Sequence, residues 1–355
     1  MIPFSILDLA PIAEGSDAGQ ALRNARSLAQ AGERLGYNRF WMAEHHSMPG
    51  IASAATSVAL GFVAEGTRML RVPSATKPKA TDVAEGTRSI RVGAGGVMLP
   101  NHSQLQIAEQ FGTLESLYPG RIDLGLGRAP GTDQAAAYAM RRNLQSDANQ
   151  FPRDVVELMD YLQPAPDEAR RVRAVPGEGL DILIWILGSS TFGAQLAGML
   201  GLPYAFASHF APGQMMEALA VYRETFRPSE RLAEPYVMLG FNTFAADSDE
   251  DGALLATSMQ QAFVALRTGN PGKLKAPVAG YADTLPDQAR AMLDGVLSCS
   301  AIGSPTSVQA AIEAFVARTG ADELMITSQI FDHAARVRSY EIVAECFAGG
   351  MRAAA

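Results

Sequence analysis

Residues 89–133 read SIRVGAGGVMLPNHSQLQIAEQFGTLESLYPGRIDLGLGRAPGTD and contain the pattern that decides the fold. The pattern is a short strand, a loop, a helix over residues 103–117 and a second strand over residues 121–126. Apolar residues at helical spacing indicate the helix, and Gly120 follows it where helices commonly end. A strand, a crossover helix and a next strand form a βαβ unit, so this stretch predicts a parallel sheet covered by helices.

The same alternation of strand and helix continues over the whole chain. Eight strands are expected, at residues 4–9, 39–43, 89–93, 121–126, 181–187, 204–207, 236–245 and 323–328. Eight strands alternating with helices predict a single-domain (β/α)8 TIM barrel that spans residues 1–355. A doubly wound open α/β sheet is the alternative, because the order of the elements does not show whether the sheet closes.

One segment interrupts the alternation before the third strand. The hexapeptide VAEGTR occurs at residues 63–68 and again at residues 83–88, so a segment looks tandemly duplicated. The sequence between the copies contains two prolines and has no apolar period, as is typical of loops. We expect residues 69–88 to form a mobile, non-catalytic insertion on the barrel face opposite the active site.

Composition limits the kinds of partner that the protein has. The net charge of −8 and the lack of a long basic run argue against a nucleic-acid partner. No apolar stretch has the length of a membrane span and the N-terminus lacks a secretory signal pattern, so we expect a cytoplasmic protein with no membrane partner. The only cysteines, Cys299 and Cys346, are expected to be buried, reduced thiols, and one disulfide between them is the alternative.

Polar residues and glycines follow the expected strands at their carboxyl ends, where a (β/α)8 barrel carries its active site. These candidates are Asp8, Glu44, His45, His46, Gly95, Gly96, Asn101, His102, Arg128, Gly188, Ser189, Ser190, Thr191, Ser208, His209, Asn242, Gln329 and His333. A histidine at a strand end is also commonly a hydrogen-bonded structural residue, so each histidine keeps that alternative.

The sequence GSST at residues 188–191 opens an expected helix and suits a phosphate group. Backbone N–H groups and hydroxyls converge there at the positive end of the helix dipole. Arg128 follows the preceding strand and would supply a planar, bidentate cation. An ordinary helix cap and a surface salt bridge are the alternatives for the two features. Together they predict a phosphorylated cofactor.

Other kinds of site lack their sequence signatures. Gly95-Gly96 is not a GxGxxG fingerprint, so a Rossmann-type nicotinamide site is not expected. HExxH, CxxC, GxSxG and P-loop motifs do not occur. We therefore expect neither a metal site nor serine-hydrolase chemistry.

Four segments together resemble the bacterial luciferase-like flavin monooxygenases. They are WMAEHH (41–46), GAGGVMLPNHSQLQIAEQFGTLESLYPGRIDLGLGRAPG (93–131), ILGSST (186–191) and GLPYAFASHF (201–210). The long second segment is the most specific of them, and the resemblance covers nearly the whole chain apart from residues 69–88. The match is closest to a subgroup of single-subunit-type, luciferase-like proteins of undefined substrate.

The resemblance implies a (β/α)8 barrel that binds FMN at the carboxyl ends of its strands. Gly95-Gly96 would lie under the isoalloxazine ring, where the family often has a non-prolyl cis peptide. Arg128 would bind the phosphate together with hydroxyl groups of residues 189–191. His45 matches the family's catalytic histidine beside the flavin, and Glu44 would pair with nearby backbone or with the cofactor.

The implied activity is two-component monooxygenation of a small organic substrate. An NAD(P)H:flavin reductase would deliver reduced FMN, which reacts with O2 to form a C4a-peroxyflavin. His45 would act as a proton donor or base, and the candidates for the substrate pocket are Asp8, His46, His102 and His209. Family members are commonly dimers, so a homodimer is expected. The alternatives are an F420-dependent oxidoreductase that transfers hydride, and a non-catalytic flavin-binding protein.

Overall fold

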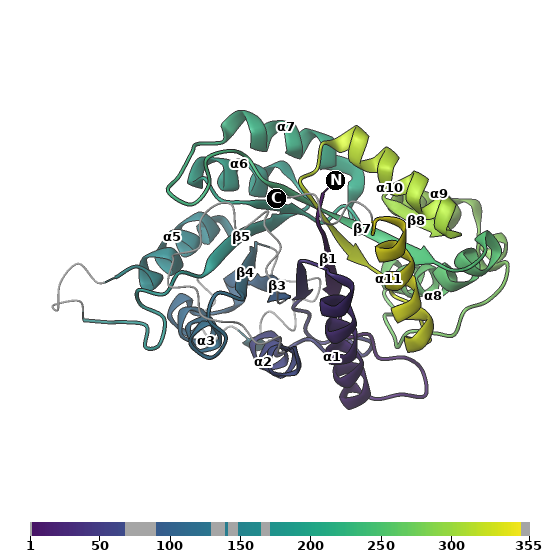
Figure 1. Ribbon diagram of the computed structural model, residues 1–355, viewed down its shortest axis with the longest axis horizontal. Helices are drawn as coiled ribbons and strands as arrows, with labels where there is room; N and C mark the ends of the chain where they lie inside the picture. Colours follow the sequence, from purple (N-terminus) through teal and green to yellow (C-terminus); the bar gives the residue numbers. More distant parts are fainter. Residues whose placement is uncertain (1, 68–89, 129–138, 141–147, 165–170, 349–355) are drawn as a thin grey trace.

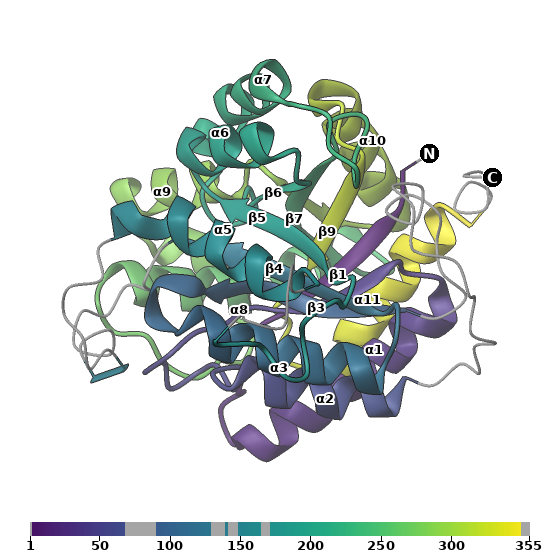
Figure 2. The ribbon, with the colours of Figure 1, turned by 90° about the vertical axis from the view of Figure 1, so that its left-hand side faces the viewer.

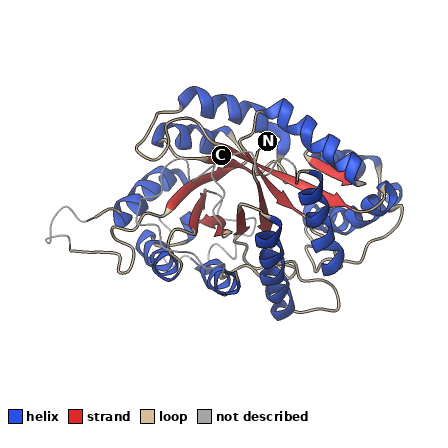
Figure 3. Cartoon of the chain, in the orientation of Figure 1, coloured by secondary structure: helices blue, strands red, loops and turns tan. Residues whose placement is uncertain are grey.

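A parallel sheet wrapped by helices forms the centre of the molecule (Figure 1). The computed structural model describes residues 2–67, 90–128, 139–140, 148–164 and 171–348. The helices lie outside the strands on all sides of the sheet (Figure 3). The expected insertion at residues 69–88 lies outside the described residues.

The strands close into a barrel in the order β1-β2-β3-β4-β5-β6-β7-β9, and β9 pairs back to β1. Every pairing between these strands is parallel. The prediction of a (β/α)8 barrel is therefore confirmed, and the open sheet is excluded. The strands are β1 (Phe4–Asp8), β2 (Arg39–Met42), β3 (Arg91–Met98), β4 (Ile122–Gly127), β5 (Leu183–Gly188), β6 (Tyr204–Phe206), β7 (Val237–Ala245), β8 (Ser300–Gly303) and β9 (Glu323–Thr327).

Helices follow the strands and cover the outside of the barrel, as Figure 2 shows for α6 and α7 beside β5 and β6. Helix α1 begins at the capping side chain of Asp17 and ends at Gly36, which has a left-handed conformation. The helices are α1 (Ala18–Leu35), α2 (Thr56–Gly66), α3 (Gln104–Leu117), α5 (Phe151–Leu162), α6 (Thr191–Leu200), α7 (Met215–Thr225), α8 (Asp249–Arg267), α9 (Asp287–Leu297), α10 (Pro305–Thr319) and α11 (His333–Cys346). No helix in the described ranges is both long and apolar enough to cross a membrane.

Two strands differ from the expectation. Strand β3 continues past residue 93 to Met98, with an irregular register opposite β4 between Ala94 and Val97. Its glycines have low strand propensity, but pairing with β2 and β4 holds the segment extended. Strand β8 was not expected at all, because its four residues, SAIG, carry almost no pattern. It pairs with the last part of β7, beyond the end of β6, and extends the barrel wall at that edge.

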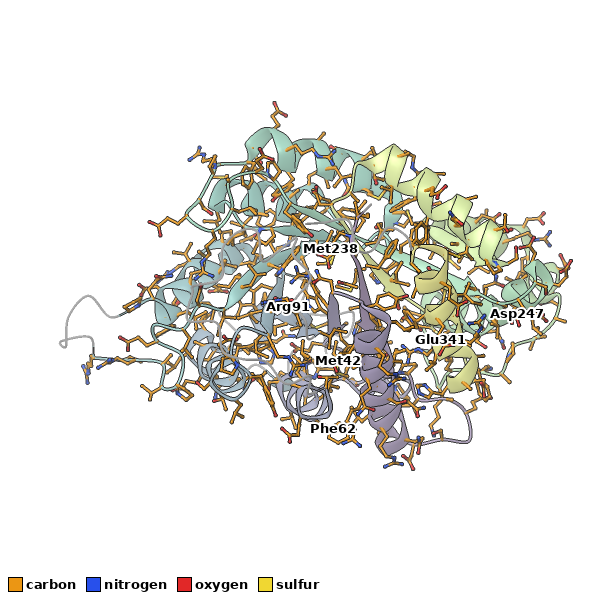
Figure 4. The ribbon with its side chains drawn as sticks, in the orientation of Figure 1. Met42, Phe62, Arg91, Met238, Asp247 and Glu341 are labelled. Carbon is orange, nitrogen blue, oxygen red and sulfur yellow. The ribbon has the colours of Figure 1, made fainter. Side chains whose placement is uncertain are left out.

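The barrel interior contains an apolar cluster that includes two tryptophans in contact. Trp41 and Trp185 meet edge to face, with ring centroids 5.2 Å apart. Leu7, Met238 and Met325 pack in the same cluster. Met238 and Arg91 lie among the strands, whereas Phe62 lies at the outer side of the helix ring (Figure 4).

Two arginines and two carboxylates fill the barrel below this cluster, at the amino ends of the strands. Arg39 Nη1 lies 2.8 Å from Asp123 Oδ2, and Arg39 Nε lies 3.0 Å from Glu323 Oε1. Arg91 Nε donates to Asp123 Oδ1 at 2.8 Å. These four side chains are at most 5% exposed, so the paired charges are taken out of water together. We call Arg39, Arg91, Asp123 and Glu323 the floor network.

We predict that Asp123→Asn destabilises the protein by about 3–5 kcal/mol, because it leaves the Arg39 charge with only one carboxylate and breaks the salt bridge of Arg91. The free energy of unfolding in urea measures this loss. Asp181→Asn is the matched control: its partner Arg231 lies 2.7 Å away, but both side chains are about one third exposed. That change should cost less than about 1 kcal/mol. Equal losses in the two variants would contradict the role of the floor network.

Candidate functional site

Glycines on β3 and β4 allow the barrel wall to close tightly below its mouth. A Cβ on Gly95 would lie 2.9 Å from Leu7 Cδ1 and 3.0 Å from Trp41 Cε3. A Cβ on Gly125 would lie 2.2 Å from the carbonyl oxygen of Ala94. The peptide bond between Gly95 and Gly96 is cis. Packing of the barrel therefore already requires these glycines, so they do not by themselves identify a ligand site.

Two histidines from opposite parts of the sequence approach each other at the mouth. His45 follows β2 and His209 follows β6, and Asn242 Nδ2 donates to the His209 carbonyl at 2.8 Å. Burial, together with the smaller effect of the neighbouring His45, lowers the pKa of His209 to about 4. Burial likewise lowers the pKa of His45, although the Ala43 backbone and Glu44 oppose that shift. Both imidazoles are therefore uncharged at neutral pH.

The His209 ring occupies the space above Gly240. A Cβ on Gly240 would lie only 2.0 Å from His209 Nδ1, so no other residue leaves room for the imidazole. His209 Nδ1 is buried and makes no hydrogen bond to the part of the chain that the structure describes.

Glu44 connects two further histidines. Its Oε1 lies 2.5 Å from His46 Nε2 and 2.7 Å from His102 Nε2, and its Oε2 accepts from the Met98 N–H at 3.0 Å. Burial raises the pKa of the Glu44 carboxyl, but the hydrogen bonds from His102 and His46 outweigh it and hold the pKa below its usual value. The structure thus brings together three residues that were predicted separately, and Glu44 is ionised.

Arg128 and the start of α6 lie side by side at the ends of β4 and β5. The Arg128 guanidinium carbon lies 4.2 Å from the centre of the Phe192 ring, in the first turn of α6. The cap residue Ser190 makes no side-chain capping bond, and the first turn contains no acidic residue. Among the described residues, no carboxylate forms a salt bridge with Arg128. We call Arg128 and the start of α6, with Gly188, Ser189 and Thr191, the corner of the mouth. This corner combines a cation with the positive end of a helix.

Asp8 has a different environment from the other candidates. Its side chain is fully buried, and its Oδ1 accepts from Arg336 at 2.8 Å and from the Ala10 N–H at 2.8 Å. Because side chains alternate along a strand, Asp8 lies on the face opposite Leu7, towards α11. Nearby, burial lowers the pKa of His333 at the start of α11. The ion pair of Asp8 with Arg336 ties β1 to α11.

A segment that lacks a sequence motif covers one side of the mouth. The Leu274 N–H donates to the Ile12 carbonyl at 2.9 Å, and the Ile12 N–H donates to the Gly50 carbonyl at 2.9 Å. The segment after α8 is thereby joined to the loops after β1 and β2. Arg267, at the end of α8, lies over the Phe210 ring at 5.4 Å. Phe210 ends the segment GLPYAFASHF that carries the family resemblance, whereas Arg267 belongs to no sequence motif.

We predict that Gly240→Ala displaces the His209 ring from its buried position. The pKa of His209 should then rise from about 4 towards its ordinary value near 6.5, because the imidazole becomes solvated. NMR titration of the imidazole C–H resonances measures the change. Gly213→Ala is the control, because a Cβ there meets nothing within 4 Å. An unchanged His209 titration in Gly240→Ala would refute the packing argument.

Comparison with known proteins gives consistent matches along the chain. The family model of luciferase-like monooxygenases matches residues 2–81 and 78–323, and the two matches meet inside the repeated segment. A luciferase-like monooxygenase of Escherichia coli (strain K12) is 50% identical over 341 residues, which is 96% of each chain. The crystal structure of apo-MsnO8 has a TM-score of 0.81 at 29% identity, covering 98% of this chain and 99% of that one.

More distant structures share the fold alone. The oxygenating constituent of 3,6-diketocamphane monooxygenase from Pseudomonas putida, in complex with FMN, has a TM-score of 0.68 at 17% identity, covering 97% of both chains. An F420-dependent secondary alcohol dehydrogenase has a TM-score of 0.65 at 14% identity, covering 97% of this chain and 98% of that one. Proteins of this fold therefore include users of both cofactors.

Proposed function

Because the chain belongs to the luciferase-like monooxygenase family, we propose that it is an FMN-dependent monooxygenase acting on a small organic substrate. Reduced FMN, when bound, supplies the electrons that activate O2. The sequence has no nicotinamide fingerprint, which supports a separate NAD(P)H:flavin reductase as the source of reduced FMN. The residues of this chain contribute binding, exclusion of water and proton transfer.

The observation that carries the proposal is the corner formed by Arg128 and α6. A phosphate monoester needs hydrogen-bond donors and positive charge, and this corner offers the guanidinium, the N–H groups of the first helical turn and the Ser190 hydroxyl. We propose that Arg128 and residues 188–191 hold the phosphate of FMN. The expected flavin position against Gly95-Gly96 stays a prediction.

His45 is the proposed proton donor or base. It is uncharged at neutral pH because burial lowers its pKa, so it can accept a proton as well as donate one after charging. The apolar residues below it, among them Leu7, Trp41 and Leu187, keep water out of the barrel. Exclusion of water protects a reactive oxygenated cofactor from side reactions.

F420 is the second candidate cofactor, because an F420-dependent dehydrogenase shares the fold. The acidic net charge of −8 favours FMN, since F420 carries an anionic oligoglutamate tail that a basic surface would bind.

We also propose a homodimer. Val58 and Phe62 on α2 and Leu117 on α3 are 73%, 38% and 64% exposed, and this apolar outer surface suits a contact between subunits.

Anaerobic titration with reduced FMN, followed by rapid mixing with O2, tests the proposal. We expect saturable binding of reduced FMN, and we expect oxidised-flavin absorbance to return much more slowly than it does from free reduced FMN. Reoxidation at the rate of free flavin would point to a carrier protein. Binding of F420 without binding of FMN would refute the choice of cofactor.

We predict that His45→Ala and Arg128→Ala have separable effects. His45→Ala should lower substrate-dependent oxygen uptake by about 10²–10⁴-fold while the FMN affinity changes little, because the histidine acts in proton transfer. Arg128→Ala should weaken FMN binding by about 1.5–3 kcal/mol, because a charge-assisted hydrogen bond is lost. Its turnover at saturating FMN should remain close to that of the wild type. Full activity of His45→Ala would remove His45 from the catalytic role.

A further inference from the structure

Three side chains of the kinds that ligate metals converge beside the mouth of the barrel. Glu44 Oε1, His46 Nε2 and His102 Nε2 all lie within 4.8 Å of one another. We propose that Glu44, His46 and His102 form a binding site for a divalent first-row transition ion, with Zn²⁺ as the occupant that best fits these donors. We call these three residues the triad site.

The Glu44 carboxylate is held in the orientation that a metal ligand needs. It is 3% exposed, and its Oε2 is fixed by the N–H of Met98 at the end of β3. Its Oε1 therefore faces the two imidazoles.

The two imidazoles come from different loops and aim at the same point. His46 follows β2, whereas His102 follows the short turn Leu99–Asn101 and donates its backbone N–H to the Leu99 carbonyl at 3.0 Å. Each Nε2 points at Glu44 Oε1, at 2.5 Å for His46 and 2.7 Å for His102. Without a cation, each Nε2 must carry a hydrogen to make this bond. With a cation, the hydrogen moves to Nδ1 and the Nε2 lone pair binds the ion.

Two imidazole nitrogens and one carboxylate oxygen are the donor set of many three-ligand zinc sites. Such sites keep one further position for water or another ligand. The His46 and His102 side chains are 21% and 26% exposed, which leaves that side of the triad site accessible to solvent. Magnesium and calcium prefer all-oxygen ligands, so the same donors select against them.

Binding of an ion in the triad site does not depend on the proposed monooxygenase activity.

The residue spacing gives no sign of this site. Glu44 and His46 are two positions apart in a loop, and His102 follows another strand, so no metal motif appears in the sequence. The expectation that the protein has no metal site rested on such motifs. The closed sheet creates the juxtaposition, because β2 and β3 are neighbours and their ends meet.

Calorimetric titration of the flavin-free, chelator-treated full chain with Zn²⁺ tests the proposal. We expect one Zn²⁺ per chain, and an affinity that falls at least about tenfold in His46→Asn and in His102→Asn. Glu44→Gln keeps an oxygen that accepts from both histidines but removes the charge, so it should weaken binding as well. His333→Asn is the matched control, because His333 lies at the start of α11 outside the triad site, and it should bind Zn²⁺ as the wild type does.

Two results would overturn the proposal. One is the absence of saturable Zn²⁺ binding by the wild-type chain. The other is unchanged affinity in both His46→Asn and His102→Asn, with circular dichroism showing that the variants are folded. Because no flavin is present, either result would leave the proposed monooxygenase function untouched.

Discussion

The floor network ties four strands of the barrel to one another through buried ion pairs. Arg39 lies between Asp123 and Glu323, and Asp123 also pairs with Arg91, so four charges from β2, β3, β4 and β9 neutralise each other in a space closed to water. A buried charge is tolerated only with its partners in place. A shift in the register of one strand would therefore leave a buried charge unpaired. The apolar layer above the floor network can repack, but the ion pairs fix which residues face one another.

That fixed register positions the mouth. With β2 held against β3 from Arg39 to Met42, the next residues, Glu44 to His46, emerge beside the end of β3 and meet His102. The polar groups at the two ends of the barrel differ. The charges of the floor network are paired with one another, whereas the mouth contains the uncharged His45 and His209, whose pKa values are lowered by burial. Arg128 supplies a cation at the edge of the mouth, next to α6.

Much of this architecture could be predicted from the sequence, because strands and helices alternate regularly and strand ends carry the polar residues. Helix α3 begins one residue after its expected start at residue 103 and ends at Leu117 as expected, and the barrel rule placed Glu44, His45 and Arg128 at the mouth. Contacts between residues far apart in the sequence could not be predicted. The four residues of β8 are too few to show the alternation of a strand. The glycines of β3 have low strand propensity, so its full length was not expected. The floor network and the meeting of Glu44 with His102 depend on the closed sheet, which no local spacing encodes.

We propose that a preformed flavin site occupies the mouth of this barrel. A crystal structure of the full chain with FMN tests this proposal most directly. We expect phosphate between Arg128 and the first turn of α6, with the flavin ring against Gly95-Gly96 and on the side of His45. Phosphate bound elsewhere, with Arg128 still stacked on Phe192 and turned away from the ligand, would contradict it.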